Sequence, residues 1–194
     1  MLVSMCAACV SRLAGEGVRE MGSIRPVLPV KMICGVISAD EALFAGVRTE
    51  LEKVFGVVDL ESETYPFSFT DYYREEMGDG LSRKFYAFRD LADPSCLADM
   101  KLRTNGLESV FSGGVAGKRP VNIDPGYVTD YGLVLATTKN FAHRIYLSKG
   151  IYGEVTLNFR KGGCVFFEWT YPDYKSGLYT PFLLQARSRY MAQR

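Results

Sequence analysis

The feature that most restricts the fold is an ordered series of strand and helix patterns between Val30 and Ile123. It starts with a continuous apolar run, Val30–Ser38, which is typical of a buried strand. A capping-box sequence, Ser38–Glu41, and apolar residues at helical spacing then predict a helix that ends at Gly56. Three strands and a second helix follow, namely strands at Val57–Tyr65, Leu81–Leu91 and Arg119–Ile123 and a helix from Asp93-Pro94 to about Phe111.

This order of elements is that of the ferredoxin-like βαββαβ unit. Right-handed crossovers in such a unit place both helices on one face of an antiparallel sheet. The chain then continues with a strand at Tyr131–Thr137 and an antiparallel β-meander, and it ends in a helix at Leu178–Arg194. The predicted fold class is therefore α+β, a ferredoxin-like core with a C-terminal β-meander extension and a terminal helix.

Two glycine-containing segments, Lys149–Ile151 and Lys161–Gly163, predict three-residue hairpin loops in the meander. In the register that follows, Ile145 and Leu147 face Val155 and Gly153, while Val155, Leu157 and Phe159 face Trp169, Phe167 and Val165. Apolar residues would then gather on one side of the sheet. The other side would carry a common polar surface made of Arg144, Tyr146, Glu154, Thr156, Asn158 and Glu168.

Charge and cysteine content narrow the class of protein. Lys and Arg total 23 and Asp and Glu total 22, so the chain lacks the basic excess of a dedicated nucleic-acid binder. The odd number of scattered cysteines predicts reduced thiols, and hence a cytoplasmic protein, rather than a disulfide framework. Cys6 and Cys9 have the spacing of a metal or redox pair, but no second pair or histidine completes a zinc set, so no metal site is predicted.

The chain divides into a short N-terminal segment and a longer folded part. Residues 1–24 are predicted to be a disordered tail or a mis-assigned start, with Met21 as the natural first residue, and residues 25–194 a single α+β domain. The apolar run near the N-terminus is too short and too interrupted for a membrane span, and no other segment could cross a bilayer.

The segment Ser112–Arg119 superficially resembles a phosphate-binding loop. It has serine where the motif needs its first glycine, and Arg119 where the motif needs a hydroxyl for magnesium. It also joins a helix to a strand, whereas a phosphate loop places backbone amides at the start of a helix. The segment is therefore predicted to be a glycine-rich helix stop, and no motif in the chain identifies a cofactor.

Asp124-Pro125-Gly126-Tyr127 has the composition of a type II turn, which would explain its proline and glycine. Alternatively, Asn122, Asp124 and Tyr127 project from the end of a strand toward a ligand. A third polar segment, Phe67–Gly78, contains Asp71 and Tyr72, and it would serve either as a functional loop or as a cover for the sheet edge. In a ferredoxin-like fold the two segments lie at opposite ends of the sheet, so they share a site only if the β extension folds back.

His143, the single histidine, predicts a structural hydrogen bond or a general base. Arg144 and Glu154 would form a cross-strand ion pair. A sharper interpretation makes Lys139, Arg144 and Lys149 a set of anion-binding cations in which Glu154 holds the arginine. No serine or cysteine has a recognisable base beside it, so nucleophilic catalysis has no support in the sequence.

Several long stretches, among them VKMICGVISADE, KRPVNIDPGY and LVLATTKNFAHRIYLSKGIYGEVTL, closely resemble a bacterial family called domain of unknown function 4416. The resemblance extends from about Pro29 to Tyr179. It implies no established activity, although some similar sequences carry the description of a GTP-binding protein.

These observations lead to three functional hypotheses. The first is binding of a small anionic ligand, such as a nucleotide or a phosphorylated metabolite. The second is a protein–protein interaction or homo-oligomer surface, because tyrosine and arginine are frequent at such contacts. The third is a hydrolase or transferase that uses His143 with Asp124 or Asp71. The predicted ligand-binding residues are Asp124, Tyr127, Lys139, His143, Arg144, Lys149 and Glu154, with Asp71, Tyr72 and Asn122 as a second tier.

Overall fold

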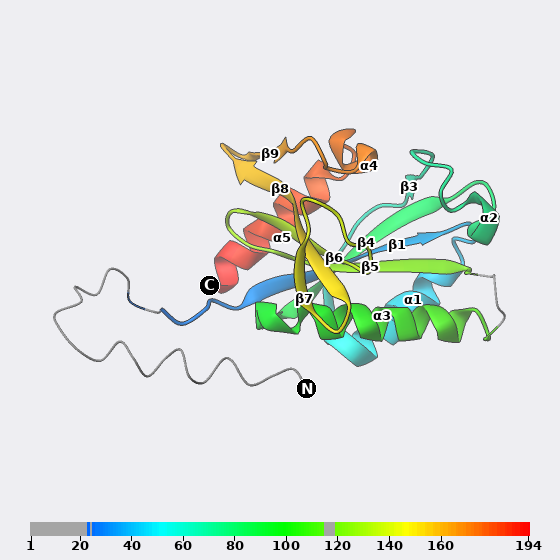
Figure 1. The fold of residues 1–194 in the computed structure, drawn as a ribbon, viewed down its shortest axis with the longest axis horizontal. Coiled ribbons are helices and arrows are strands. Elements are labelled where there is room, and N and C mark those ends of the chain that lie inside the picture. The colour runs from blue at the N-terminus through cyan, green and yellow to red at the C-terminus, as the bar shows by residue number, and fades with distance from the viewer. Residues whose placement is uncertain (1–22, 24, 115–118) are drawn as a thin grey trace, which may run out of the picture.

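The computed structural model describes residues 23, 25–114 and 119–194, which form a large antiparallel sheet with helices on both faces (Figure 1). The strands are β1 (Val30–Ser38), β2 (Val58–Glu61), β3 (Tyr65–Pro66), β4 (Ser82–Ala92), β5 (Val121–Val128), β6 (Gly132–Thr137), β7 (Ile145–Ser148), β8 (Ile151–Arg160) and β9 (Gly163–Phe166). The helices are α1 (Leu43–Phe55), α2 (Arg74–Met77), the 3-10 turn η1 (Pro94–Cys96), α3 (Leu97–Phe111), α4 (Pro172–Lys175) and α5 (Thr180–Gln193). The predicted α+β class is confirmed.

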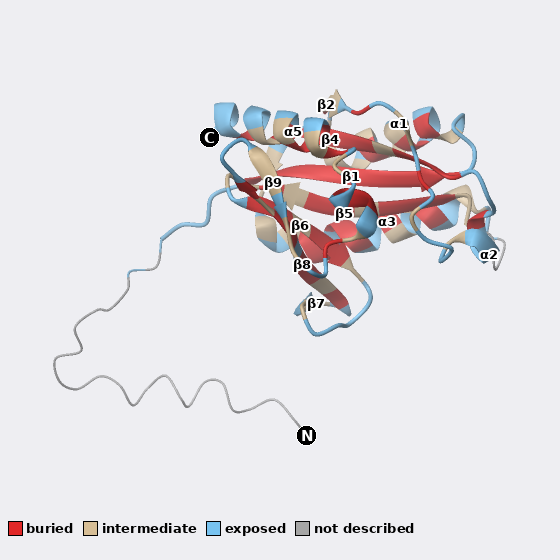
Figure 2. Cartoon of the chain, turned by 90° about the horizontal axis from the view of Figure 1, so that it is seen from above, coloured by how far each residue is buried: buried red, intermediate tan, exposed pale blue. Residues whose placement is uncertain are grey.

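The strands follow the order β2-β4-β1-β5-β6-β8-β7, with β3 paired to β4 and β9 paired to β8. Helices α1 and α3 lie on one face, where Met32, Cys34 and Val36 of β1 pack against them. On the other face, Ile33 packs into a cluster that includes residues of α5. Strand β1 is therefore buried on both faces, as Figure 2 shows, and this explains why its sequence is apolar apart from Lys31 and Ser38.

The predicted capping box at Ser38–Glu41 is wrong, because α1 begins later, at Leu43. Ser38 remains in β1, and its hydroxyl donates a hydrogen bond to the Pro120 carbonyl at 2.8 Å. The Glu41 carboxylate instead accepts a hydrogen bond from the Ser82 hydroxyl at 2.7 Å. Ser38 thus connects β1 to the chain before β5, and Glu41 connects the turn before α1 to β4.

The predicted type II turn at Asp124-Pro125-Gly126 is also wrong, because β5 runs straight through it and pairs with β1 along its whole length. The Ile123 amide and carbonyl bond to side chains of α3, so they point away from β1. Two residues on, the Pro125 nitrogen points to the same edge. Pairing with β6 begins only at Gly126, so the proline removes no ladder hydrogen bond there.

Both hairpin loops of the meander contain two residues, not the predicted three. Lys149 and Gly150 have φ of 52° and 77°, and Lys161 and Gly162 have φ of 48° and 78°, as a type I′ turn requires. The shorter second loop moves the register of β9 by one residue. Leu157 therefore pairs with Phe166 and Phe159 with Cys164, whereas Phe167 and Trp169 lie beyond the strand.

The predicted separation of an apolar and a polar side in the meander is wrong as well. Leu133 pairs with Leu157 but Val134 pairs with Val155, so Thr156 is an extra residue and forms a bulge in β8. The bulge changes which residues face inward: Leu157 and Phe159 are buried, but Val155 is 41% exposed. Glu154 and Thr156 are buried, so they are not part of a solvent-exposed polar surface.

Some predictions fall outside the described residues. They are the N-terminal tail at 1–24, apart from residue 23, the Cys6–Cys9 pair, and residues 115–118 of the segment that resembles a phosphate loop. None of the helices in the described part of the chain is both long and apolar enough to cross a membrane.

Candidate functional site

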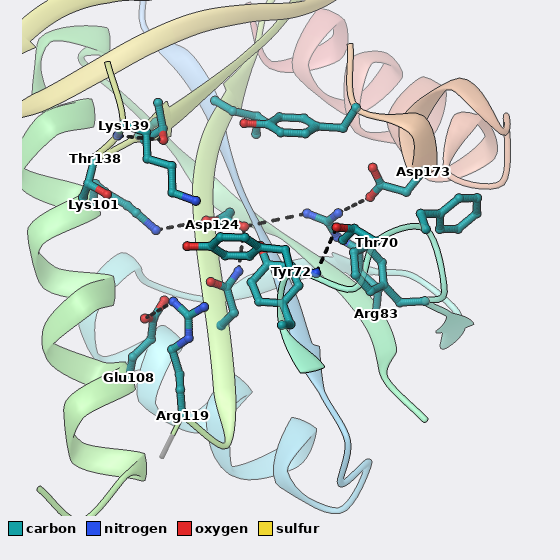
Figure 3. Close-up of a pocket in the computed structure, with 18 of the residues that line it drawn as sticks. Thr70, Tyr72, Arg83, Lys101, Glu108, Arg119, Asp124, Thr138, Lys139 and Asp173 are labelled. Atoms are coloured by element: carbon teal, nitrogen blue, oxygen red, sulfur yellow. Dashed lines mark hydrogen bonds and ion pairs between the residues drawn. The ribbon is translucent and has the colours of Figure 1, made fainter. Parts of the chain in front are cut away.

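A cavity of about 560 Å³ opens where β5 and β6 separate. The two strands pair only at Gly126–Val128, so the earlier residues of β5 form a free edge. The loop that follows β3, the start of α4 and the face of α3 complete the walls. We call this space the β5–β6 cavity, and its principal lining residues are Tyr72, Arg83, Lys101, Asp124, Lys139 and Tyr171 (Figure 3).

Two side chains of α3 take the place of a strand partner at the free edge of β5. The Ile123 amide donates to the Glu108 carboxylate at 2.7 Å, and the Lys101 ammonium donates to the Ile123 carbonyl at 2.9 Å. Lys101 and Glu108 are seven residues apart, which is about two helical turns, so they lie on the same face of α3. The buried edge therefore has its polar groups satisfied without β6.

Alternating charges cross the floor of the cavity, as Figure 3 shows. Lys101 bonds Asp124 at 3.0 Å, the Arg83 guanidinium lies 4.0 Å from the other oxygen of Asp124, and Arg83 also pairs with Asp173. The Asn122 amide donates to Asp124 at 2.7 Å. Burial opposes ionisation of Asp124, but Lys101 and Arg83 outweigh it and hold the pKa of its carboxyl below the usual value. Asp124 is therefore a fixed carboxylate whose charge is already balanced.

Arg83 is held in a nest of aromatic rings. Its guanidinium carbon lies 5.0 to 5.6 Å from the ring centres of Phe67, Phe85, Tyr174 and Tyr179. Gly35 of β1 lies next to Arg83. A Cβ added at Gly35 would stand 2.9 Å from the Phe85 ring and 3.0 Å from an Arg83 nitrogen. Glycine in the middle of a buried strand is thus explained by the close approach of Phe85 and Arg83.

Two cations lie over the tyrosines of the loop that follows β3. The Lys139 ammonium is 3.6 Å from the centre of the Tyr72 ring, and the Arg119 guanidinium is 5.3 Å from that of Tyr73. Arg119 pairs with Glu76 at 2.9 Å. Within residues 23, 25–114 and 119–194, Lys139 has no carboxylate partner. Lys139 is thus a cation of the cavity wall whose charge no described carboxylate balances.

Four of the predicted residues line the cavity, and the others lie elsewhere. Asp124, Asn122, Lys139 and Tyr72 are in its walls. Tyr127 lies on the opposite face of the sheet, against the core beneath α1 and α3. Lys149 pairs with Asp99 at 2.5 Å at an exposed hairpin tip, and Asp71 is exposed beside Arg74. The loop at 67–73 and Asp124 do share one site, because Asp124 lies within a strand and not at a distant turn.

His143, Arg144 and Glu154 form a cluster behind the cavity wall. The predicted Arg144–Glu154 ion pair is present at 2.7 Å, and His143 Nε2 lies 3.3 Å from the same carboxylate oxygen. The described acidic neighbour of His143 is therefore Glu154, not Asp124 or Asp71. The His143 ring stacks on Trp169 with centres 5.3 Å apart and an angle of 12° between their planes.

Comparison with protein families gives a match to a domain of unknown function, DUF4416, over residues 28–190. The chain belongs to the DUF4416 family. Comparisons of this DUF4416 chain with curated proteins and with solved structures gave no match.

Several residues of the DUF4416 cavity were not predicted, although the sequence contains a signal for some of them. Arg83 occupies the inward side of β4, two residues from Leu81 and from Phe85, where an apolar residue is expected. Lys101 and Glu108 likewise interrupt the buried face of α3 that begins with Leu97. A charged residue on a periodic apolar face is thus the available signal. Asp173 and Tyr171 have no comparable local pattern.

Glu108→Gln should change how the stability of this DUF4416 protein depends on pH. Burial raises the pKa of the Glu108 carboxyl above its ordinary value of 4.5, and Lys101 offsets this only partly. Between pH 4.5 and the higher pKa of the folded state, the folded protein keeps a proton that the unfolded protein has released. The free energy of unfolding of wild type therefore falls as pH rises through this range. Glutamine keeps the acceptor for Ile123 but does not titrate. Urea unfolding at increasing pH should show the variant gaining stability relative to wild type.

Glu75→Gln, which neutralises an exposed carboxylate on α2, is the matched control for the loss of one acidic group. A stability difference between Glu108→Gln and wild type that is constant across this pH range would contradict the assignment of a raised pKa to Glu108.

Proposed function

We propose that this protein binds a small anionic ligand, such as a nucleotide or a phosphorylated metabolite, in the β5–β6 cavity. The observation that carries the proposal is Lys139, a cavity cation over Tyr72 that no described carboxylate neutralises. Its ammonium would exchange a weak contact with an aromatic ring for a charge-assisted bond to the ligand. A volume of about 560 Å³ is also in the range of small-molecule sites.

The basic residues and aromatic rings that line the cavity favour a ligand that combines an anionic group with a planar group. Its lining contains four basic residues, Arg83, Lys101, Arg119 and Lys139, against three acidic ones, Glu108, Asp124 and Asp173. The acidic residues already bond to cations or to a backbone amide, so they would repel an entering anion only weakly. Phe69, Tyr72 and Tyr73 provide aromatic surface for a base or another flat group.

Lys139→Ala should remove at least about half of the ligand-induced stabilisation. We suggest a thermal-shift screen with inorganic phosphate, ribose 5-phosphate, GMP and GTP. A probe at about 100 times its Kd stabilises the fold by ~2.7 kcal/mol, or roughly 5–10 °C for a chain of this size. Loss of the Lys139 contact should weaken affinity at least about tenfold, which corresponds to ~1.4 kcal/mol.

Lys149→Ala is the matched control, because Lys149 is also a lysine of the β extension, but it lies at the exposed tip of the β7–β8 hairpin and pairs with Asp99. It should leave the shift unchanged. Absence of a shift with every probe, or equal shifts in the Lys139 and Lys149 variants, would count against an anion site in this cavity.

We also infer that β1, β2, β4 and β5 with α1 and α3 form a ferredoxin-like core. The strand order β2-β4-β1-β5, with both helices on one face, is the arrangement that the split βαββαβ unit gives. In this view α5 and β6–β9 are additions, and α5 covers the face that the two helices leave open. Free Cys34, Cys96 and Cys164 support a reducing compartment such as the cytoplasm.

A second candidate function is association with a protein partner or with another copy of the chain. The observation that favours it is β7, an end strand of the sheet with exposed Ile145, Tyr146 and Leu147. The mass in solution, measured by light scattering, separates this candidate from a monomeric ligand-binding protein.

A further inference from the structure

Arg144 joins three separate parts of the chain immediately outside the β5–β6 cavity. Its Nε donates to the Glu154 carboxylate at 2.7 Å, its Nη1 to the Lys139 carbonyl at 3.0 Å, and its Nη2 to the Tyr171 hydroxyl at 2.9 Å. Every nitrogen of the guanidinium thus has a partner within the protein. These bonds use three of its five N–H groups and tie the guanidinium to all three parts of the chain.

Two of the three partners line the cavity, namely Lys139 and Tyr171, whereas Arg144 itself does not. We propose that Arg144 is a positioning residue, which sets where the Lys139 ammonium and the Tyr171 ring stand in the cavity wall. The expected effect of Arg144 on ligand binding rests on the proposed function, but the positions of Lys139 and Tyr171 can be tested without a ligand.

The segment that carries Lys139 depends on this contact. Residues 138–144 connect β6 to β7 and are outside the strand ladders, and most of them are exposed. Two short-range bonds shape the segment: the Lys139 amide donates to the Thr137 hydroxyl, and the Arg144 amide donates to the Phe141 carbonyl. The Arg144 guanidinium adds the connection from this segment to β8 and to the chain before α4.

The anchor of the arrangement is Glu154, whose side chain is 1% exposed. One of its carboxylate oxygens contacts both Arg144 and His143, and the other has no hydrogen-bond partner within the described residues. A buried carboxylate needs compensating charge, so Glu154 favours one location for the guanidinium. The planar fork of arginine then fixes the directions in which Lys139 and Tyr171 are held, which a lysine could not do.

Arg144→Lys tests the positioning directly, because it keeps a positive charge near Glu154 but replaces the planar fork of arginine with a single ammonium. The measurement is the rate at which a small amine-acylating reagent modifies Lys139 in the full chain, read by mass spectrometry, with Lys149 as the internal reference. We expect the ratio of the Lys139 rate to the Lys149 rate to rise severalfold in the variant. An unchanged ratio in the folded variant would overturn the proposal.

Tyr171→Phe provides a second variant if Arg144→Lys does not fold. It keeps the ring in the wall but removes the hydroxyl that accepts from Arg144. A smaller rise in the labelling ratio is expected, since the Arg144 bond to Lys139 remains. If Tyr171→Phe leaves the ratio at its wild-type value, Arg144 does not act through this contact.

A double-mutant cycle connects the positioning to binding, with inorganic phosphate and GTP as probes. Arg144→Lys should weaken binding severalfold in the wild-type chain but have little further effect in Lys139→Ala. Independent, multiplicative losses would show that Arg144 does not act through Lys139. If wild type binds neither probe while the labelling ratio still rises, the positioning stands and anion binding by this cavity fails.

Discussion

Arg83→Met is expected to lower the free energy of unfolding by about 3–5 kcal/mol, the cost of leaving a buried charge without its partner. Asp173 would keep its carboxylate beside an apolar side chain, and that carboxylate is almost completely buried. Asp124 would lose one of the two cations that hold its pKa down. Methionine fills much of the volume of arginine, so the loss reports on charge more than on a cavity.

Chemical denaturation of the full chain measures this effect, and a double variant provides the control. Arg83→Met combined with Asp173→Leu removes both charges of the pair and leaves an apolar contact. Because such replacements of buried pairs are often neutral, the double variant should recover much of the stability lost in the single one. A single variant within about 1 kcal/mol of wild type would mean that Arg83 does not stabilise the cavity floor.

Gly126→Ala is expected to cost about 1–3 kcal/mol or more, because the new methyl group meets backbone as well as a neighbouring side chain. Its Cβ would stand 2.5 Å from the Val134 carbonyl oxygen and 2.6 Å from the Leu135 side chain. Gly126 is the first residue of β5 that pairs with β6. The substitution should therefore push the strands apart at the point where the β5–β6 cavity begins, and it should also weaken ligand binding.

The same substitution at Gly106 has the opposite expected sign. Gly106 is exposed in the middle of α3, and an added Cβ there meets no atom within 4 Å. Alanine should stabilise the helix by about 0.5–1 kcal/mol. Unfolding of both variants in urea gives the comparison, and a Gly126→Ala variant as stable as wild type would show that β5 and β6 are not in close contact at this residue.

Local patterns were sufficient for much of the fold. The strand predicted at Val30–Ser38 coincides with β1, and the strand predicted at Leu81–Leu91 differs from β4 by one residue at each end. Both strands lie inside the sheet, where burial on two faces makes the pattern strong. The terminal helix is also confirmed, as α5, with Pro181 in its first turn.

The errors occur where a distant contact overrides a local preference. Pro125 and Gly126 favour a turn by composition, but β1 and β6 hold both residues in an extended strand. The bulge at Thr156 has no sequence signal, so the prediction continued the strict in–out alternation of β8 through a residue where the strand interrupts it. Hairpins at Lys149-Gly150 and Lys161-Gly162 need a lysine with positive φ, for which glycine or asparagine is the usual signal.

The candidate site was found only in part for the same reason. Asp124, Lys139 and Tyr72 stood out because they are polar or aromatic residues near turn signals, yet they come from segments far apart in the chain. Their convergence depends on the separation of β6 from β5 and on α4, which supplies Asp173. Neither feature has a local sequence pattern. The charged residues Arg83, Lys101 and Glu108 were missed because their strands and helix were judged by their apolar positions.

The most direct test of the anion site is a crystal structure of the full chain with the probe that gives the largest thermal shift. We predict electron density for the phosphate inside the β5–β6 cavity, with an oxygen at hydrogen-bonding distance of about 2.7–3.2 Å from the Lys139 ammonium and that ammonium moved off the Tyr72 ring. Density for the bound probe at another surface, with the cavity empty and Lys139 still over Tyr72, would contradict the account.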